Sequence, residues 1–213
     1  MIVDLHAHYP MHLDPGLRGN LWSLLRTRRG QLEIRDHLRA LGENLASQFA
    51  NYPSLFSRER VRINWMAEGG VGVAYSVLYS FFDEADRSPP GPREYTDVLL
   101  RQARLVEQSL KGRDAVVARS PRDLALVPGK VTLVHCVEGG FHLGGTPEAV
   151  DQAVTELARR GVAYIILPHL FWRGVATNAN ALPFLSDRVY HLLFRQPKLG
   201  LSDLGRARRG AAG

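Results

Sequence analysis

The sequence predicts an α/β fold with a largely parallel sheet of about five strands. Short apolar runs of β type alternate with longer segments of helical period, and this alternation is typical of repeated βα units. Hydrophobic residues make up 45% of the 213 residues, enough to build a real core. Because an eight-stranded (β/α)8 barrel of the TIM type usually needs about 250 residues, the chain corresponds to rather more than half of such a barrel.

The expected elements follow one another in the order of a βα repeat. The predicted strands are Ile2–His8, Val71–Ser80, Ala115–Ala118, Val131–Val137 and Val162–Pro168. The predicted helical segments are Leu17–Arg39 and further material up to about Glu68, about Tyr95 to Lys111, and Pro147–Arg160. The last helix has the clearest ends, because Thr146 is a suitable N-cap and Gly161 a suitable stop. Ser88–Pro92 is a loop by composition.

Charge and composition exclude several classes of protein. The net charge is +6 and the pI about 9.8, but the basic residues are scattered through predicted helices such as Leu17–Arg39 and Arg101–Arg113. No basic stripe interleaves with aromatic residues as in single-strand binding. A solvated, arginine-rich surface is therefore favoured, and no nucleic-acid partner is expected.

Cysteine usage and the N-terminal sequence bear on the compartment. Cys136 is the only cysteine, so no disulfide within the chain is expected. Asp4 and His6 stand where a signal peptide would have its basic and apolar regions, and no apolar run approaches the length of a membrane span. We therefore expect a cytoplasmic protein without a membrane partner.

Two histidines end the first predicted strand. In the segment Asp4–His8, strand geometry places His6 and His8 on one face, at the carboxyl end where parallel barrels carry their active sites. Two imidazoles in this position can bind one metal ion. By spacing alone, two ordinary packed or exposed histidines are an equally good interpretation.

A carboxylate ends the fourth predicted strand. Glu138 shares its face with Val134 and Cys136, and a carboxylate at the mouth of a barrel is costly to bury without a cation. Gly139 and Gly140 allow the backbone to turn sharply beside it. A helix-capping or solvated glutamate is the competing interpretation.

A binuclear site also needs an anionic bridge between its metal ions. The three lysines, which could serve in carbamylated form, are Lys111, Lys130 and Lys198, and none ends a strand. Glu138 is therefore the credible bridge. His169 ends the fifth predicted strand, on the face of Ile165 and Leu167, as either a ligand or a substrate-binding group.

The remaining histidines and the cysteine are weaker candidates. His135 alternates away from Glu138, and His142 is close enough to act as an outer hydrogen-bond donor. Cys136 lies in mid-strand among apolar neighbours and is expected to be an inert core thiol. Three further histidines lack partner spacing and are expected to be structural or exposed: His12, His37 and His191. No Gly-x-Ser-x-Gly elbow or phosphate-binding glycine loop occurs.

Five segments together resemble, in their order along the chain, the membrane (renal) dipeptidases of peptidase family M19 in the amidohydrolase superfamily. They are Asp4–His8, Glu138–His142, Gly161–His169, Asn178–Asn180 and Gly200–Gly205. The resemblance implies that residues 1–213 are the N-terminal portion of a single metallo-dependent hydrolase barrel. In the family, two further metal-binding histidines and an aspartate come from later strands, and the chain ends at Gly213 before them.

The resemblance also implies roles for individual residues. His6 and His8 would bind the first of two zinc ions, Glu138 would bridge both as the catalytic carboxylate, and His169 would contact the substrate. The family usually has His-x-Asp where this chain has His6-Ala7-His8. Histidine can replace aspartate as a zinc ligand, but the charge of the site changes.

The activity implied is metal-assisted hydrolysis of a dipeptide or a related small amide. Two zinc ions polarise the scissile carbonyl and lower the pKa of a bridging water, which attacks the amide carbon. Positive groups would recognise a free carboxylate of the substrate, and Arg173 in the loop after His169 is one candidate. Family members often dimerise, so the resemblance also implies a homodimer.

Two other functions agree with the same sequence. The first is a catalytically inactive fragment that keeps a residual metal site on His6, His8 and Glu138. The second is a basic binding protein without enzymatic activity, which strong salt-dependent binding to nucleic acid without bound metal would favour.

Overall fold

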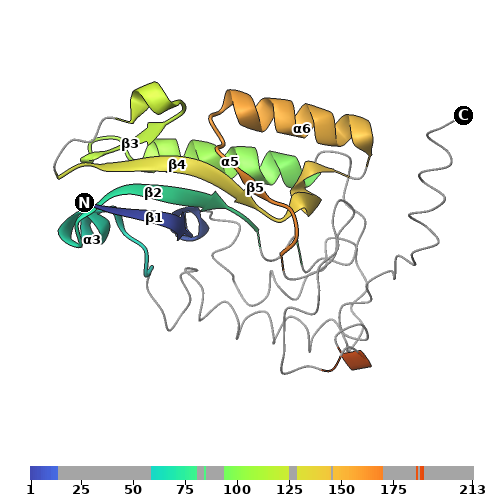
Figure 1. The fold of residues 1–213 in the computed structure, drawn as a ribbon, viewed down its shortest axis with the longest axis horizontal. Coiled ribbons are helices and arrows are strands. Elements are labelled where there is room, and N and C mark those ends of the chain that lie inside the picture. The colour runs from blue at the N-terminus through green and yellow to red at the C-terminus, as the bar shows by residue number, and fades with distance from the viewer. Residues whose placement is uncertain are drawn as a thin grey trace, which may run out of the picture.

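A computed structural model describes residues 1–13, 59–80, 84, 94–124, 129–144, 146–169, 186 and 188–189 (Figure 1). Within these ranges, helices and strands form a mixed α/β structure. Several sequence predictions fall outside the described residues: the helix Leu17–Arg39, the loop Ser88–Pro92, the segments Asn178–Asn180 and Gly200–Gly205, and the residues His37, Arg173, His191 and Lys198.

The described residues form five strands, in agreement with the sequence. They are β1 (Ile2–Ala7), β2 (Val71–Leu78), β3 (Ala115–Ala118), β4 (Val131–Glu138) and β5 (Ile165–Ile166). All four pairings between them are parallel, as expected for βα units. The fifth strand is much shorter than the predicted Val162–Pro168, because only its two middle residues pair with β4.

The strand order is β1-β2-β4-β3, with β5 also paired to β4. Since β2 lies along one edge of β4, both β3 and β5 lie along the other. β3 pairs with the first half of β4, at Val131–Val134, and β5 pairs with its last two residues, Val137 and Glu138. The third strand is therefore outside the fourth, whereas a barrel that adds its strands in chain order would place it between the second and the fourth.

The sheet curls into a half-barrel. The Tyr164 hydroxyl, immediately before β5, donates to the Leu5 carbonyl oxygen in β1 at 2.6 Å, and its ring stacks on Tyr75 of β2 with centroids 5.4 Å apart. In a flat sheet, three strand spacings would separate β1 from β5 by roughly 14 Å, which is beyond the reach of one tyrosine. Tyr164 therefore spans the concave face of a curled sheet.

Helices cover the convex face. They are α3 (Ile63–Glu68), α5 (Glu94–Ser109) and α6 (Pro147–Arg159), with α5 and α6 on the same side of the sheet in Figure 1. All of β4 is buried, as in parallel sheets covered on both faces. Leu133 and Val137 pack under the helices, while Val134 and Cys136 pack with the tyrosines of the concave side. No described helix combines the length and the apolar character needed to cross a membrane.

The ends of α6 are those predicted from the sequence. The Thr146 Oγ1 accepts a hydrogen bond from the Ala149 amide at 3.2 Å, which is an N-cap. Gly161 follows the helix with φ of +79°, the left-handed conformation that favours glycine. A Cβ atom at Gly161 would also lie 2.3 Å from the Arg119 Cα, so this turn is fixed by the close approach of two backbones.

Replacing Gly161 with alanine is expected to destabilise the fold more than replacing Gly112. Gly112 has a similar φ of +75°, but no atom of the described residues lies within 4 Å of the place that a Cβ atom would take there. Gly112→Ala therefore costs only backbone strain of roughly 1–3 kcal/mol. Gly161→Ala adds a clash with the Arg119 backbone that cannot relax by a rotamer change. Chemical denaturation of the two variants checks this, and equal losses would contradict it.

Candidate metal centre

The two N-terminal histidines come together at the carboxyl end of β1. Between Asp4 and Ala7 the pairing of β1 with β2 shifts register, and the Asp4 Oδ1 accepts from the His6 amide at 2.9 Å. His8 follows the strand and precedes the short 3-10 helix η1 (Tyr9–His12). The Nε2 atoms of His6 and His8 are 3.1 Å apart, so both side chains point to one place, as the sequence predicts.

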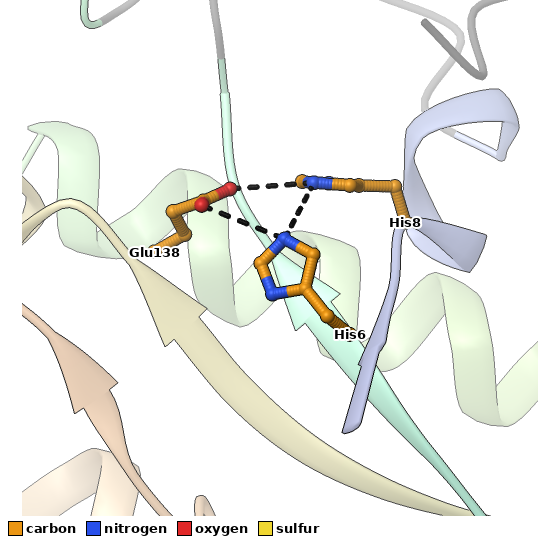
Figure 2. A group of neighbouring side chains, drawn as sticks. All are labelled: His6, His8 and Glu138. Atoms are coloured by element: carbon orange, nitrogen blue, oxygen red, sulfur yellow. Dashed lines mark hydrogen bonds and ion pairs between the residues drawn. The ribbon is translucent and has the colours of Figure 1, made fainter. Parts of the chain in front are cut away.

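Glu138, the last residue of β4, reaches the same place. Its Oε1 lies 3.5 Å from the His6 Nε2 and its Oε2 lies 3.3 Å from the His8 Nε2. Figure 2 shows the three side chains pointing toward one another from two different strands. One ligand atom from each of the three residues lies within 4.8 Å of the other two. The residues predicted to bind metal therefore form one cluster.

Gly139 directs the chain away from Glu138. Its φ is +89°, and a Cβ atom there would lie 2.3 Å from the Phe141 ring. Its amide donates to the Ile166 carbonyl at 2.8 Å, and the next amide, of Gly140, donates to the Leu167 carbonyl at 2.7 Å. The turn predicted from the two glycines thus exists, and it joins the end of β4 to the segment that carries His169.

The spacing of the cluster suits a tetrahedral ion. Zinc bonds of about 2.0–2.2 Å at tetrahedral angles place neighbouring ligand atoms roughly 3.3–3.6 Å apart. The two Nε2 atoms are 3.1 Å apart, and each lies 3.3–3.5 Å from a different oxygen of Glu138, close to this range, while one ligand atom from each residue lies within 4.8 Å of the others. Two imidazole nitrogens and a carboxylate also form a donor set typical of zinc, whereas calcium and magnesium prefer oxygen alone.

The electrostatics of the cluster favour a cation. Burial lowers the pKa of His8 to about 4, with further lowering by His6 and His169, so this imidazole is neutral and has a lone pair to offer at neutral pH. Burial raises the pKa of Glu138; His169 and His6 counteract part of the increase, and nearby Glu84 adds a smaller contribution to it. Among the described residues, the buried Oε2 of Glu138 accepts no hydrogen bond, so a bound cation would offset the cost of burying this carboxylate.

His169 joins the cluster from the segment after β5. Its Nε2 lies 3.2 Å from the Glu138 Oε1, and its Nδ1 lies 2.7 Å from the Glu84 Oε2. Burial alone would lower the pKa of His169, but the hydrogen bond to Glu84 and the charges of Glu84 and Glu138 leave it raised. The predicted fourth site residue is therefore beside Glu138, although it lies outside the short strand β5.

Comparison with protein-family models, with curated proteins and with solved structures found no match for this chain.

The other candidates lie where the sequence predicts. The Nδ1 of His142 is 2.9 Å from the Gly139 carbonyl oxygen, so this ring braces the turn beside Glu138 as an outer group. His135 is buried on the opposite face of β4, near Glu107 of α5, and its two ring nitrogens have no hydrogen-bond partner within the described ranges. Burial raises the pKa of Cys136 to about 11, which keeps the thiol protonated and inert, as expected.

Two residues of the site, Tyr79 and Glu84, were not predicted from the sequence. Glu84 is completely buried, and its Oε2 accepts from the Tyr79 hydroxyl at 2.5 Å and contacts His169. Both residues follow the carboxyl end of β2, which is the same edge of the sheet that carries His8 and Glu138. The signal available in the sequence was an acid a few residues beyond an apolar strand, at the end where parallel sheets place their sites.

Proposed function

We propose that this protein is a zinc-dependent amidohydrolase of the M19 dipeptidase type, built on a curled parallel half-barrel, that hydrolyses a dipeptide or a related small amide. The observation that supports this proposal is the convergence of His6, His8 and Glu138 at the carboxyl mouth of a curled parallel sheet. The order of the motifs along the chain agrees with it.

The residues present fit a zinc ion. His6 and His8 would hold it through their Nε2 atoms, and Glu138 would supply its Oε2, which accepts no hydrogen bond from the described part of the chain. Zinc bound there would polarise a substrate carbonyl and lower the pKa of a bound water. Glu138 would serve as the catalytic carboxylate beside that water, and as the bridge if a second ion binds.

His169 would bind the substrate. Its Nε2 faces Glu138 while its Nδ1 is occupied by Glu84, so only Nε2 is directed toward the centre. When an ion engages Glu138, this nitrogen is placed to hydrogen-bond the substrate next to it. The side chain is partly exposed, which leaves room for a small ligand to approach.

Metal content and hydrolysis measured on the same samples test the proposal. We expect near-stoichiometric zinc in the purified protein and its loss in His6→Ala and Glu138→Ala, because each removes a ligand of a three-residue cluster. His12→Ala is the matched control, since His12 lies in η1 outside the cluster. Turnover of dipeptides by the zinc-loaded protein supports the enzyme, and zinc without turnover supports an inactive metal-binding protein. A folded wild-type protein without zinc would rule out both.

A further inference from the structure

Glu84 is held in place from two sides. Its amide donates to the Ser80 carbonyl at 3.1 Å, and its Oε2 accepts from the Tyr79 hydroxyl at 2.5 Å. The carboxylate is fully buried. Burial of a carboxylate costs several kcal/mol unless it is paired and hydrogen-bonded, so the bonds at this oxygen determine how it can be accommodated.

Tyr79 is itself fixed to helix α5. Its amide donates to the Gln102 Oε1 at 2.9 Å, and the Gln102 Nε2 donates back to the Tyr79 carbonyl at 2.8 Å. The ring of Tyr79 lies edge-on to His169, with centroids 4.8 Å apart. Two hydrogen bonds with the buried Gln102 thus hold the backbone of Tyr79 in place. Tyr79 in turn holds the Glu84 carboxylate through its hydroxyl.

The contact between Glu84 and His169 dictates which ring nitrogen carries the proton. The Glu84 Oε2 already accepts from Tyr79, and an ionised carboxylate only accepts hydrogen bonds, so with Glu84 ionised the contact of 2.7 Å to His169 places a proton on Nδ1. The other nitrogen, Nε2, is then the one that faces the Glu138 Oε1 at 3.2 Å. In metalloenzymes, the partner of one imidazole nitrogen generally sets the orientation and protonation of the other.

We propose that Glu84, braced by Tyr79, is a positioning residue that holds His169 with its proton on Nδ1 and its Nε2 directed at the metal centre. This assigns a role to a side chain that is not one of the three residues of the candidate metal cluster. Its importance for substrate binding rests on the proposed function. The hydrogen-bond arrangement itself does not, because it exists in the metal-free protein.

Nitrogen NMR of the histidine rings tests the arrangement directly. We expect the neutral form of His169 in the metal-free wild type to carry its proton on Nδ1, with its signals assigned by their loss in His169→Gln. Glu84→Leu removes the acceptor and is expected to let the Nε2-protonated form appear. Glu84→Gln is expected to keep the Nδ1 proton, because the Tyr79 hydroxyl favours the amide oxygen in the place of Oε2.

The control is Asp123→Asn, which changes a carboxylate to an amide in an exposed turn, and it is expected to leave the His169 signals unchanged. In the zinc-loaded protein, Glu84→Leu is expected to keep its zinc but to raise KM for a dipeptide by roughly 10–100-fold, the usual effect of losing an outer partner.

An Nε2-protonated His169 in the wild type would overturn the proposal, and so would an unchanged tautomer in a folded Glu84→Leu protein. Should Glu84→Leu fail to fold, the wild-type and Glu84→Gln spectra still decide. A wild-type protein that binds no zinc would rule out the proposed function. The ring spectra would still show whether Glu84 determines which nitrogen of His169 carries the proton.

Discussion

Glu138→Gln is expected to abolish zinc binding while leaving the metal-free fold as stable as the wild type or more so. The variant removes one of three ligands, so the loss of affinity should exceed the roughly 10–100-fold that follows loss of an outer partner. Zinc at 100 times its Kd would stabilise the wild type by about 2.7 kcal/mol. That gain should disappear in the variant.

The metal-free stability follows from the raised pKa of Glu138. When the pKa of a carboxyl group is higher in the folded state than in the unfolded state, the folded protein loses stability as the pH rises through the folded-state pKa. Above that pH the ionised Glu138 destabilises the fold, whereas the neutral amide in the Glu138→Gln variant would not. The three changes Glu138→Gln, His6→Gln and the control His12→Gln should be compared by thermal unfolding with and without zinc. A Glu138→Gln protein that unfolds far more easily without zinc would show that the carboxylate is structural.

Metal-free protein is expected to unfold in mild acid, between about pH 6.5 and 4. His8, His135 and His142 each have a pKa lowered from 6.5 to about 4, chiefly by burial. A histidine whose pKa is lowered by folding takes up its proton more readily in the unfolded state. Its contribution to the free energy of unfolding is therefore complete above the unfolded-state pKa and is lost as the pH falls toward the folded-state pKa. At 1.36 kcal/mol for each pKa unit, each histidine accounts for roughly 3 kcal/mol.

Three such residues together reach the range of 5–15 kcal/mol that is typical of a whole domain. Urea denaturation at a series of pH values checks this expectation. His135→Leu is the informative variant, because it removes a buried ring whose nitrogens have no hydrogen-bond partner among the residues that the structure describes. It should raise stability at neutral pH and make the acid dependence shallower by about one third. A stability that stays flat from pH 7 to pH 4 would contradict the burial of all three rings.

Local patterns were enough to predict the first and fourth strands and the residues at their ends. Alternation along Val131–Glu138 placed Glu138 with Val134 and Cys136, and His135 on the other side, as the packing shows. The period of two also predicted that His6 and His8 point together. These features depend only on neighbours in sequence, which is why the sequence could reveal them.

Long-range features were not predictable in the same way. The position of β3 outside β4 depends on the lengths of the strands. β3 has four residues and β5 has two, so both fit end to end along one edge of the eight-residue β4. Glu84 has no motif of its own. Its importance comes from Tyr79 and His169, and the latter is 85 residues away in sequence.

The reach of Tyr164 also has a consequence for the order of folding. Its hydroxyl closes a contact between residues 159 positions apart, and contacts of such high sequence separation are entropically expensive and form late. The metal cluster is likewise assembled from segments far apart in sequence, the end of β1 and the end of β4. On refolding, the helical signal of α5 and α6 should therefore return before the protein can capture a metal ion, so that metal capture reports the last step of chain closure.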